Sequence, residues 1–110
     1  MGAPGSIDPA AGVVFEAVNI GGWDGPFPLG PALAEELGVP VTLGNDVSVA
    51  VEAERRYGAG RGVRSFLGVF WGTGVGGGLV VDGRLLHGRG SAGEIGHVCA
   101  KSGGRRCNCG

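Results

Sequence analysis

The sequence predicts an α/β protein, and two patterns carry that prediction. Between residues 31 and 57, a helical segment, a short apolar run and a second helical segment follow one another, which is the order of an α/β layer. Between residues 65 and 86, three apolar runs are separated by glycine-containing turns, as in consecutive antiparallel strands. A chain of 110 residues has room for one small domain or for a piece of a larger one.

The first thirty residues are dominated by turn signals. Residues 1–12 contain two proline turn signals and a glycine, so we expect turns there. Residues 13–18 are apolar enough to form a short strand, and we expect an irregular loop over residues 19–31. This part should therefore contribute one strand and little other regular structure.

The helix predicted over residues 31–38 carries signals at both ends. Pro31 stands in the first turn, where its missing N–H costs nothing, and Gly38 lies just past the last turn. The apolar residues 39–43 then predict a buried strand, which tolerates Pro40 only near its beginning.

Asn45 and Asp46 lie where the strand predicted at 39–43 meets a helix that runs to about Tyr57 and stops at Gly58. Ligands of open α/β sheets bind at the carboxyl ends of strands, and a helix N-terminus favours an ionised carboxylate. Asp46 is therefore a candidate general base. The alternative is that Asn45 or Asp46 only caps the helix.

The last part of the fold is predicted to be a meander of three strands. Residues 65–71 and 76–81 have the content of strands, and Asp82-Gly83 is a strong hairpin signal before a third strand at 84–86. We expect these strands to pair antiparallel and the rest of the chain to be loops.

A glycine run separates the first two of these strands. Glycines let backbone N–H groups approach an anion without hindrance from side chains, and a threonine adds a hydroxyl donor. The run lacks the Lys-Ser/Thr of a Walker loop, and a strand rather than a helix follows it. The alternative is a hairpin that simply turns. The run consists of Gly72, Thr73, Gly74, Val75, Gly76, Gly77 and Gly78.

Near the C-terminus, His97, Cys107 and Cys109 form a candidate zinc site. One imidazole and two thiolates suit a tetrahedral zinc ion, although a closed structural site takes four ligands. Cys99 is either the fourth ligand or a small buried apolar side chain. Three cysteines, an odd number, argue against a disulfide framework.

Composition excludes several classes of protein. Nine Lys and Arg against ten Asp and Glu give a net charge of −1, which argues against nucleic acid or an anionic membrane as the main partner. No apolar run approaches the ~20 residues of a membrane span, and the first residues lack a charged leader followed by an apolar core. We therefore expect a cytoplasmic protein.

The order of these motifs resembles the ROK family of repressors, open reading frames and sugar kinases, and most of all its bacterial glucokinases. The motifs that carry the resemblance are Asn45-Asp46, the glycine run, Asp82-Gly83, Gly93-Glu94-Ile95-Gly96-His97 and Cys107-Asn108-Cys109-Gly110. The resemblance implies an ATP-dependent hexose kinase built from two actin-like (ribonuclease-H-like) lobes. Residues 1–57 would end the first, sugar-binding lobe, and residues 58–110 would open the second.

The resemblance also implies roles for the candidate residues. Asp46 would be the catalytic base, and Asn45, Asp46, Glu94 and His97 would hydrogen-bond the sugar. The glycine run would be the second phosphate-binding loop for ATP with Mg²⁺. His97, Cys107 and Cys109 would be three of four ligands of a structural Zn²⁺.

Several parts of the family pattern are absent from these 110 residues. They are the first phosphate loop, the adenosine-contacting region, and the third cysteine and glutamate that follow the cysteine motif. We therefore expect an incomplete chain that is inactive and marginally folded alone, and a dimer or tetramer when complete. A sugar-sensing ROK transcriptional regulator and a non-catalytic sugar-binding fragment stay as alternatives. The hexose, most simply glucose, and the choice between ATP and polyphosphate stay open.

Overall fold

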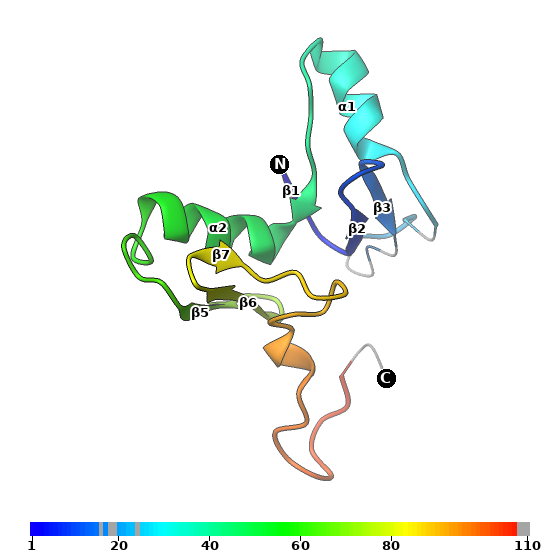
Figure 1. Ribbon diagram of the computed structural model, residues 1–110. Coiled ribbons are helices and arrows are strands. Elements are labelled where there is room, and N and C mark those ends of the chain that lie inside the picture. The colour runs from blue at the N-terminus through cyan, green and yellow to red at the C-terminus, as the bar shows by residue number, and fades with distance from the viewer. Residues whose placement is uncertain (16, 18–19, 24, 108–110) are drawn as a thin grey trace. The chain divides into compact units, whose positions relative to one another are not determined.

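The computed structural model describes residues 1–15, 17, 20–23 and 25–107, and it divides into two compact units, Met1–Ala53 and Glu54–Gly110 (Figure 1). The structure combines helices and strands, as the sequence predicts. The elements are β1 (Gly2–Ala3), β2 (Ser6–Asp8), β3 (Val13–Phe15), α1 (Leu29–Leu37), β4 (Gly44–Asn45), α2 (Asp46–Tyr57), β5 (Phe66–Trp71), β6 (Val75–Val81), β7 (Arg84–Leu85) and the 3₁₀ turn η1 (Ile95–His97).

The first unit is built from two short strand pairs. β1 pairs in parallel with β4, so that Ala3 lies opposite Asn45, and β2 pairs antiparallel with β3. Buried side chains from these strands and from residues next to them form a small core, against which partly buried apolar residues pack. The core consists of Ala3, Val14, Ala17 and Leu43, and the residues against it are Ile7, Trp23, Leu29 and Val41.

The turns expected over residues 1–12 are present at residues 4–5 and 9–12, but the strands β1 and β2, which the turn signals do not predict, lie there as well. The turn signals themselves hold: Gly5 and Gly12 have φ values of +90° and +65°. The strands form because their partners lie elsewhere in the chain, and such pairing overrides local turn preference. The strand predicted over 13–18 is observed as β3, with residues 16 and 18 outside the described residues.

The strand predicted over residues 39–43 is wrong. These residues have no strand pairing, and the parallel ladder begins at Gly44, opposite Gly2. Pro40 has no N–H to donate to a ladder, which weakens this segment as a strand. The predicted burial is nevertheless confirmed at the last residue of this segment, since Leu43 is 5% exposed.

The two predicted helices are confirmed. α1 begins two residues before the predicted start and ends at Leu37. It is capped by Gly38, whose φ is +66° and whose N–H donates to the Ala34 carbonyl at 3.0 Å. α2 begins at Asp46 and ends at Tyr57, as predicted, and the Gly58 N–H donates to the Glu54 carbonyl at 3.0 Å.

The second unit contains the predicted antiparallel meander, in the strand order β5-β6-β7. Asp82 and Gly83 connect β6 to β7 with φ values of +49° and +77°. Two consecutive positive φ values are those of a type I′ turn, whose twist suits a hairpin. The side chain of Asp82 also pairs with Arg64, whose guanidinium lies 3.0 Å from the carboxylate.

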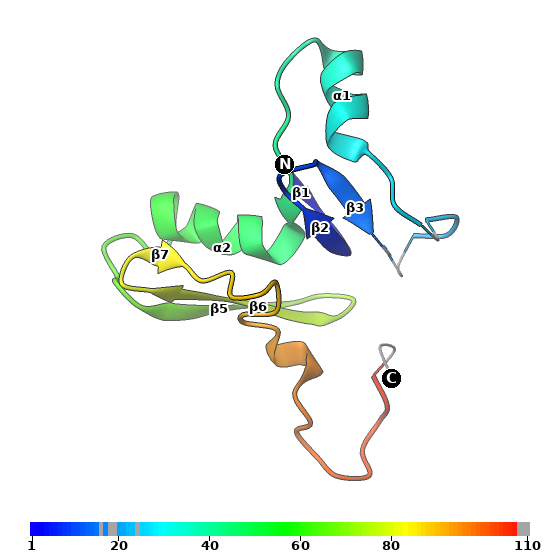
Figure 2. The same ribbon diagram turned by 45° about the vertical axis from the view of Figure 1, so that its right-hand side comes forward.

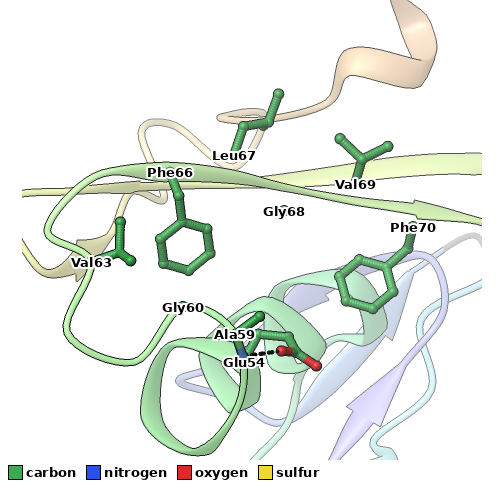
Figure 3. Close-up of a pocket in the computed structure, with 9 residues that line it drawn as sticks. All are labelled: Glu54, Ala59, Gly60, Val63, Phe66, Leu67, Gly68, Val69 and Phe70. Carbon is green, nitrogen blue, oxygen red and sulfur yellow. Dashed lines mark hydrogen bonds between the residues drawn. The ribbon is translucent and has the colours of Figure 1, made fainter.

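The two faces of this sheet carry different side chains, because successive residues of a strand point to opposite sides. Phe66 and Phe70 of β5 point into a hollow of about 390 Å³ that Glu54 and Ala59 also line, whereas Leu67 and Val69 point away from it (Figure 3). The Glu54 carboxylate accepts the Ala59 N–H at 2.8 Å. On the other face, η1 lies close to β6 (Figure 2).

Candidate functional site

Asn45 holds the beginning of α2. Its side-chain Oδ1 accepts the Ser48 N–H at 3.2 Å, the hydrogen bond of a helix cap, and its Nδ2 donates to the Gly5 carbonyl at 3.4 Å. Sequence reasoning left open whether Asn45 or Asp46 caps the helix. The structure assigns the cap to Asn45, and the side chain of Asp46 is not needed for it.

Asp46 is the first residue of α2 and is exposed to solvent. Its Oδ1 accepts the N–H of the next residue, Val47, at 2.9 Å, and no described residue donates a hydrogen bond to Oδ2. An exposed carboxylate with an available oxygen can accept a proton from a hydroxyl group placed beside it.

The backbone of β1 runs close to this carboxylate. A Cβ atom on Gly2 would lie 3.0 Å from the Cα of Asp46, which is closer than side chains normally approach a backbone. Gly2 therefore lets β1 pair beside the start of α2 and so sets the position of Asp46. Sequence reasoning missed this role, because the pairing of β1 with β4 is not visible in the local pattern.

The glycine run divides into an exposed turn and a buried strand. Residues 72–74 connect β5 to β6 and are exposed, and Cβ atoms on Gly72 or Gly74 would meet nothing within 4 Å. The Gly72 N–H donates to the Gly74 carbonyl at 2.9 Å, which closes the turn. Gly77 and Gly78 lie in β6 and are buried, so the groups open to a ligand are those of residues 72–75.

Glu94 and His97 lie on one short segment of the second unit. The Ile95 N–H donates to the Gly93 carbonyl at 2.7 Å, and the His97 N–H to the Glu94 carbonyl at 3.2 Å. The two side chains face each other, since Glu94 Oε2 lies 3.8 Å from His97 Nε2. Both are partly exposed and so can reach a ligand in solution.

The other ring nitrogen of His97, Nδ1, lies 3.7 Å from the sulfur of Cys107. Zinc bonds of about 2.3 Å to sulfur and about 2.0 Å to nitrogen place two tetrahedral ligands about 3.5 Å apart. His97 and Cys107 therefore fit neighbouring positions around one zinc ion. The carboxylate of Glu94 beside Nε2 is also the partner that a metal-bound histidine commonly has.

The rest of the predicted zinc site is described only in part. Cys109 lies outside the described residues, and within 1–15, 17, 20–23 and 25–107 no group of three His, Cys, Asp or Glu residues could hold a metal ion. Cys99 is exposed, which removes the alternative that it is a small buried apolar side chain. His97 and Cys107 are thus the described half of the predicted ligand set.

The candidate residues belong to different units. Asn45 and Asp46 lie in the first, and the glycine run, Glu94, His97 and Cys107 lie in the second. That the two groups of residues share one site stays a prediction. No helix in the described part of the chain is long and apolar enough to cross a lipid bilayer.

Known proteins resemble the whole chain. The glucokinase of Halalkalibacterium halodurans is 48% identical over 112 residues, covering 100% of this chain and 33% of that protein. The DNA-binding transcriptional repressor Mlc of Escherichia coli K12 is 41% identical over 113 residues, covering 97% of this chain and 26% of the repressor. The chain therefore spans about a third of the length of that glucokinase and about a quarter of the length of the repressor.

Solved structures agree with the sequence relatives. The ROK hexokinase of Thermus thermophilus superposes with a TM-score of 0.80 at 43% identity, covering 99% of this chain and 36% of that one. A ROK family glucokinase from Streptomyces griseus, in complex with glucose and AMPPNP, gives a TM-score of 0.77 at 38% identity, covering 88% of this chain and 31% of that one.

The mixed α/β structure is thus consistent with part of an actin-like ATPase fold, as the sequence predicts. The sequence profile of the ROK family matches residues 1–110, the entire chain. The resemblance found in the motifs is therefore confirmed, and the chain belongs to the ROK family.

Proposed function

We propose that this chain is part of an ATP-dependent hexose kinase that converts glucose to glucose 6-phosphate. The observation that carries the proposal is the exposed Asp46 carboxylate at the N-terminus of α2, directly beside Asn45. The identity of 48% with a glucokinase over the full chain supports it. The Streptomyces griseus relative, in complex with glucose and AMPPNP, supports a sugar and a nucleotide as ligands.

In this proposal, Asp46 would take the proton from the sugar hydroxyl as the hydroxyl oxygen attacks the γ-phosphorus of ATP. The bond from the γ-phosphorus to the β-γ bridging oxygen would break, and ADP would leave. Phosphoryl transfer requires positioning and neutralisation of charge more than covalent chemistry by the protein. Asp46 supplies the proton acceptor from its place at the first residue of α2. The side chains of Asn45, Glu94 and His97 would orient the sugar by hydrogen bonds to its other hydroxyl groups.

The exposed part of the glycine run would contact the phosphates of the nucleotide. Gly72 and Gly74 leave open space beside the turn, and Thr73 adds a hydroxyl donor. ATP with Mg²⁺ would supply the phosphoryl group and much of the charge neutralisation. This role assigns residues 1–57 to the end of the sugar-binding lobe and residues 58–110 to the opening of the second lobe.

A structural Zn²⁺ belongs to the same proposal. The 3.7 Å separation of His97 Nδ1 and Cys107 Sγ supports it, with Cys109 as a third ligand and one further ligand completing the tetrahedron. A zinc ion there would order the segment that presents Glu94 and His97, and it would take no part in the transfer of the phosphoryl group.

The similarity to the repressor Mlc favours one second candidate, a sugar-sensing regulator. A regulator would bind the sugar through the same residues but would not need a proton acceptor at position 46. The two candidates therefore differ in the effect of removing the Asp46 carboxylate. In a kinase this loss lowers kcat at least about 10²-fold, whereas a regulator has no turnover to lose.

A chimera tests the proposal, because the chain covers about a third of its relatives. The 110 residues would replace the matching segment of the Halalkalibacterium halodurans glucokinase, to which they align from end to end. We expect ATP-dependent phosphorylation of glucose in a coupled assay. Asp46→Asn should lower kcat at least about 10²-fold, the usual contribution of a general base.

The matched control is Asp82→Asn, the same chemical change at another exposed aspartate. Asp82 lies in a hairpin turn with a positive φ that asparagine also adopts, so its activity should stay near that of the parent chimera. Full activity of Asp46→Asn would remove Asp46 from the mechanism. Sugar binding without turnover in the parent chimera would favour the regulator.

A further inference from the structure

The segment of residues 93–97, which carries Glu94 and His97, lies directly on strand β6 through glycines (Figures 1 and 2). A Cβ atom on Gly96 would overlap the carbonyl oxygen of Val75, and one on Gly77 would overlap the carbonyl oxygen of Gly93. A Cβ atom on Gly93 would lie 2.9 Å from the Gly77 carbonyl oxygen and 2.9 Å from the Cα of Gly78. Backbone thus packs on backbone from both sides.

Any side chain at these positions would require the backbone of β6 or of the segment to move. A side chain can change rotamer, as the Ile95 side chain beside Gly77 could, but the atom nearest a Cβ on each of Gly77, Gly93 and Gly96 belongs to the backbone. β6 is in turn held by its full register with β5, in which Val75 lies opposite Trp71 and Gly77 opposite Val69. The position of the segment is therefore set by the sheet.

The contact at Gly96 joins two groups of functional residues. On one side, Gly96 directly precedes His97, whose ring lies near Cys107. On the other side, Val75 directly follows the exposed turn of residues 72–74. A movement of His97 therefore acts on the residue that ends the turn, through one backbone contact.

We propose that Gly77, Gly93 and Gly96 are positioning residues that join the turn at 72–75 and the segment at 93–97 into one rigid piece, so that a metal ion held by His97 and Cys107 also orders the turn. This inference rests on the proposed function, in which the turn binds the phosphates and the segment binds the sugar and zinc. Coupling between two sites is reciprocal, so binding at the turn would equally favour the ordered metal site.

Gly96→Ala and Gly77→Ala separate this role from backbone strain. Neither glycine has a positive φ, so alanine is excluded at both positions only by the lack of space. Gly25→Ala is the matched control, since Gly25 also has no positive φ and a Cβ there meets nothing within 4 Å. Gly93 is a poorer probe, because its φ of +88° already requires glycine.

The experiment is amide hydrogen exchange on the chimera with the Halalkalibacterium halodurans glucokinase, followed by mass spectrometry of peptides that cover 72–75, 94–98 and helix α1. The probe is Co²⁺, whose absorption bands report tetrahedral coordination by a thiolate. We expect Co²⁺ to slow exchange at both 94–98 and 72–75. Gly96→Ala and Gly77→Ala should each speed exchange at both peptides by at least about fivefold, as overpacking does, and should remove the effect of Co²⁺ at 72–75.

The peptide from α1, in the first unit, distinguishes positioning from a general loss of stability. It should exchange at the parent rate in both variants, and Gly25→Ala should behave as the parent chain throughout. Failure of Co²⁺ to bind, protection confined to 94–98, or equal acceleration in α1 would each overturn the inference. The kinase proposal is tested separately by Asp46→Asn, in the other unit, so the two can fail independently.

Discussion

Replacing Asn45 provides a quantitative test of how the start of α2 is held. Asn45→Ala removes the cap on the Ser48 N–H, which costs about 1 kcal/mol, and it leaves the Gly5 carbonyl without its side-chain donor. The second contact, at 3.4 Å, is long and contributes at most about 1 kcal/mol. We therefore expect a loss of about 1–2 kcal/mol in the free energy of unfolding of the first unit.

Two further variants divide this loss between the two contacts. Asn45→Asp keeps an oxygen that caps the helix but cannot donate to Gly5, so it should retain most of the stability. Asn45→Ser keeps the cap with a shorter side chain and should behave in the same way. The ranking, with alanine clearly the least stable, is the signature of a cap.

Tryptophan fluorescence in urea can follow the first unit alone. The protein has two tryptophans, and Trp71 of the second unit is 87% exposed, so Trp71→Phe should be tolerated and leave Trp23 as the reporter. Trp23 packs against the core of the first unit and stacks on Phe27 at 5.5 Å between ring centroids. Equal midpoints for Asn45→Ala and the parent, or a loss as large in Asn45→Asp as in Asn45→Ala, would refute the assignment of the cap.

Two other substitutions test the packing and the surface charges. Val14→Ala, at a core residue that is 1% exposed, should cost about 1–3 kcal/mol of unfolding free energy in the same urea titration, whereas Val39→Ala, at a residue that is 52% exposed, should change it by less than about 0.5 kcal/mol. Arg64→Ala removes an ion pair with Asp82 whose side chains are 80% and 74% exposed, so thermal unfolding should detect a loss below about 1 kcal/mol that disappears in high salt. A large loss of unfolding free energy in Val39→Ala or Arg64→Ala would contradict the small contribution expected of these exposed side chains.

The elements that sequence predicted well are those whose signals are local. α2 was predicted from a capping residue and a terminal glycine, and both act as expected at Asn45 and Gly58. The hairpin at Asp82-Gly83 was predicted from a dipeptide that adopts two positive φ values. In each case the residues that define the boundary are adjacent to it, so no knowledge of the remaining fold was needed.

The errors concern contacts between distant parts of the chain. β1 finds its partner about forty residues away at Gly44, and the strand predicted at 39–43 was displaced to Gly44–Asn45 by that same pairing. The close packing at Gly77 and Gly96 was missed for the same reason. The spacing Gly93-x-x-Gly96 is visible in the sequence, but only the position of β6 shows why both residues are glycine.

The structure bears on the geometry of part of the candidate site, and the roles of its residues stay predictions. Sequence alone brought His97 and Cys107 together as metal ligands, and their side chains lie 3.7 Å apart. It treated the glycine run as one loop, whereas the run divides into an exposed turn and the buried Gly77 and Gly78 of β6. The division depends on the sheet register, which composition does not encode.

A crystal structure of the chimera with glucose and AMPPNP tests the central claim most directly. We expect one Asp46 carboxylate oxygen within about 2.6–3.2 Å of the sugar hydroxyl nearest the γ-phosphate, and we expect the turn at residues 72–75 to contact the phosphates. An Asp46 carboxylate turned away from the sugar, or a nucleotide bound with no contact to that turn, would contradict the account.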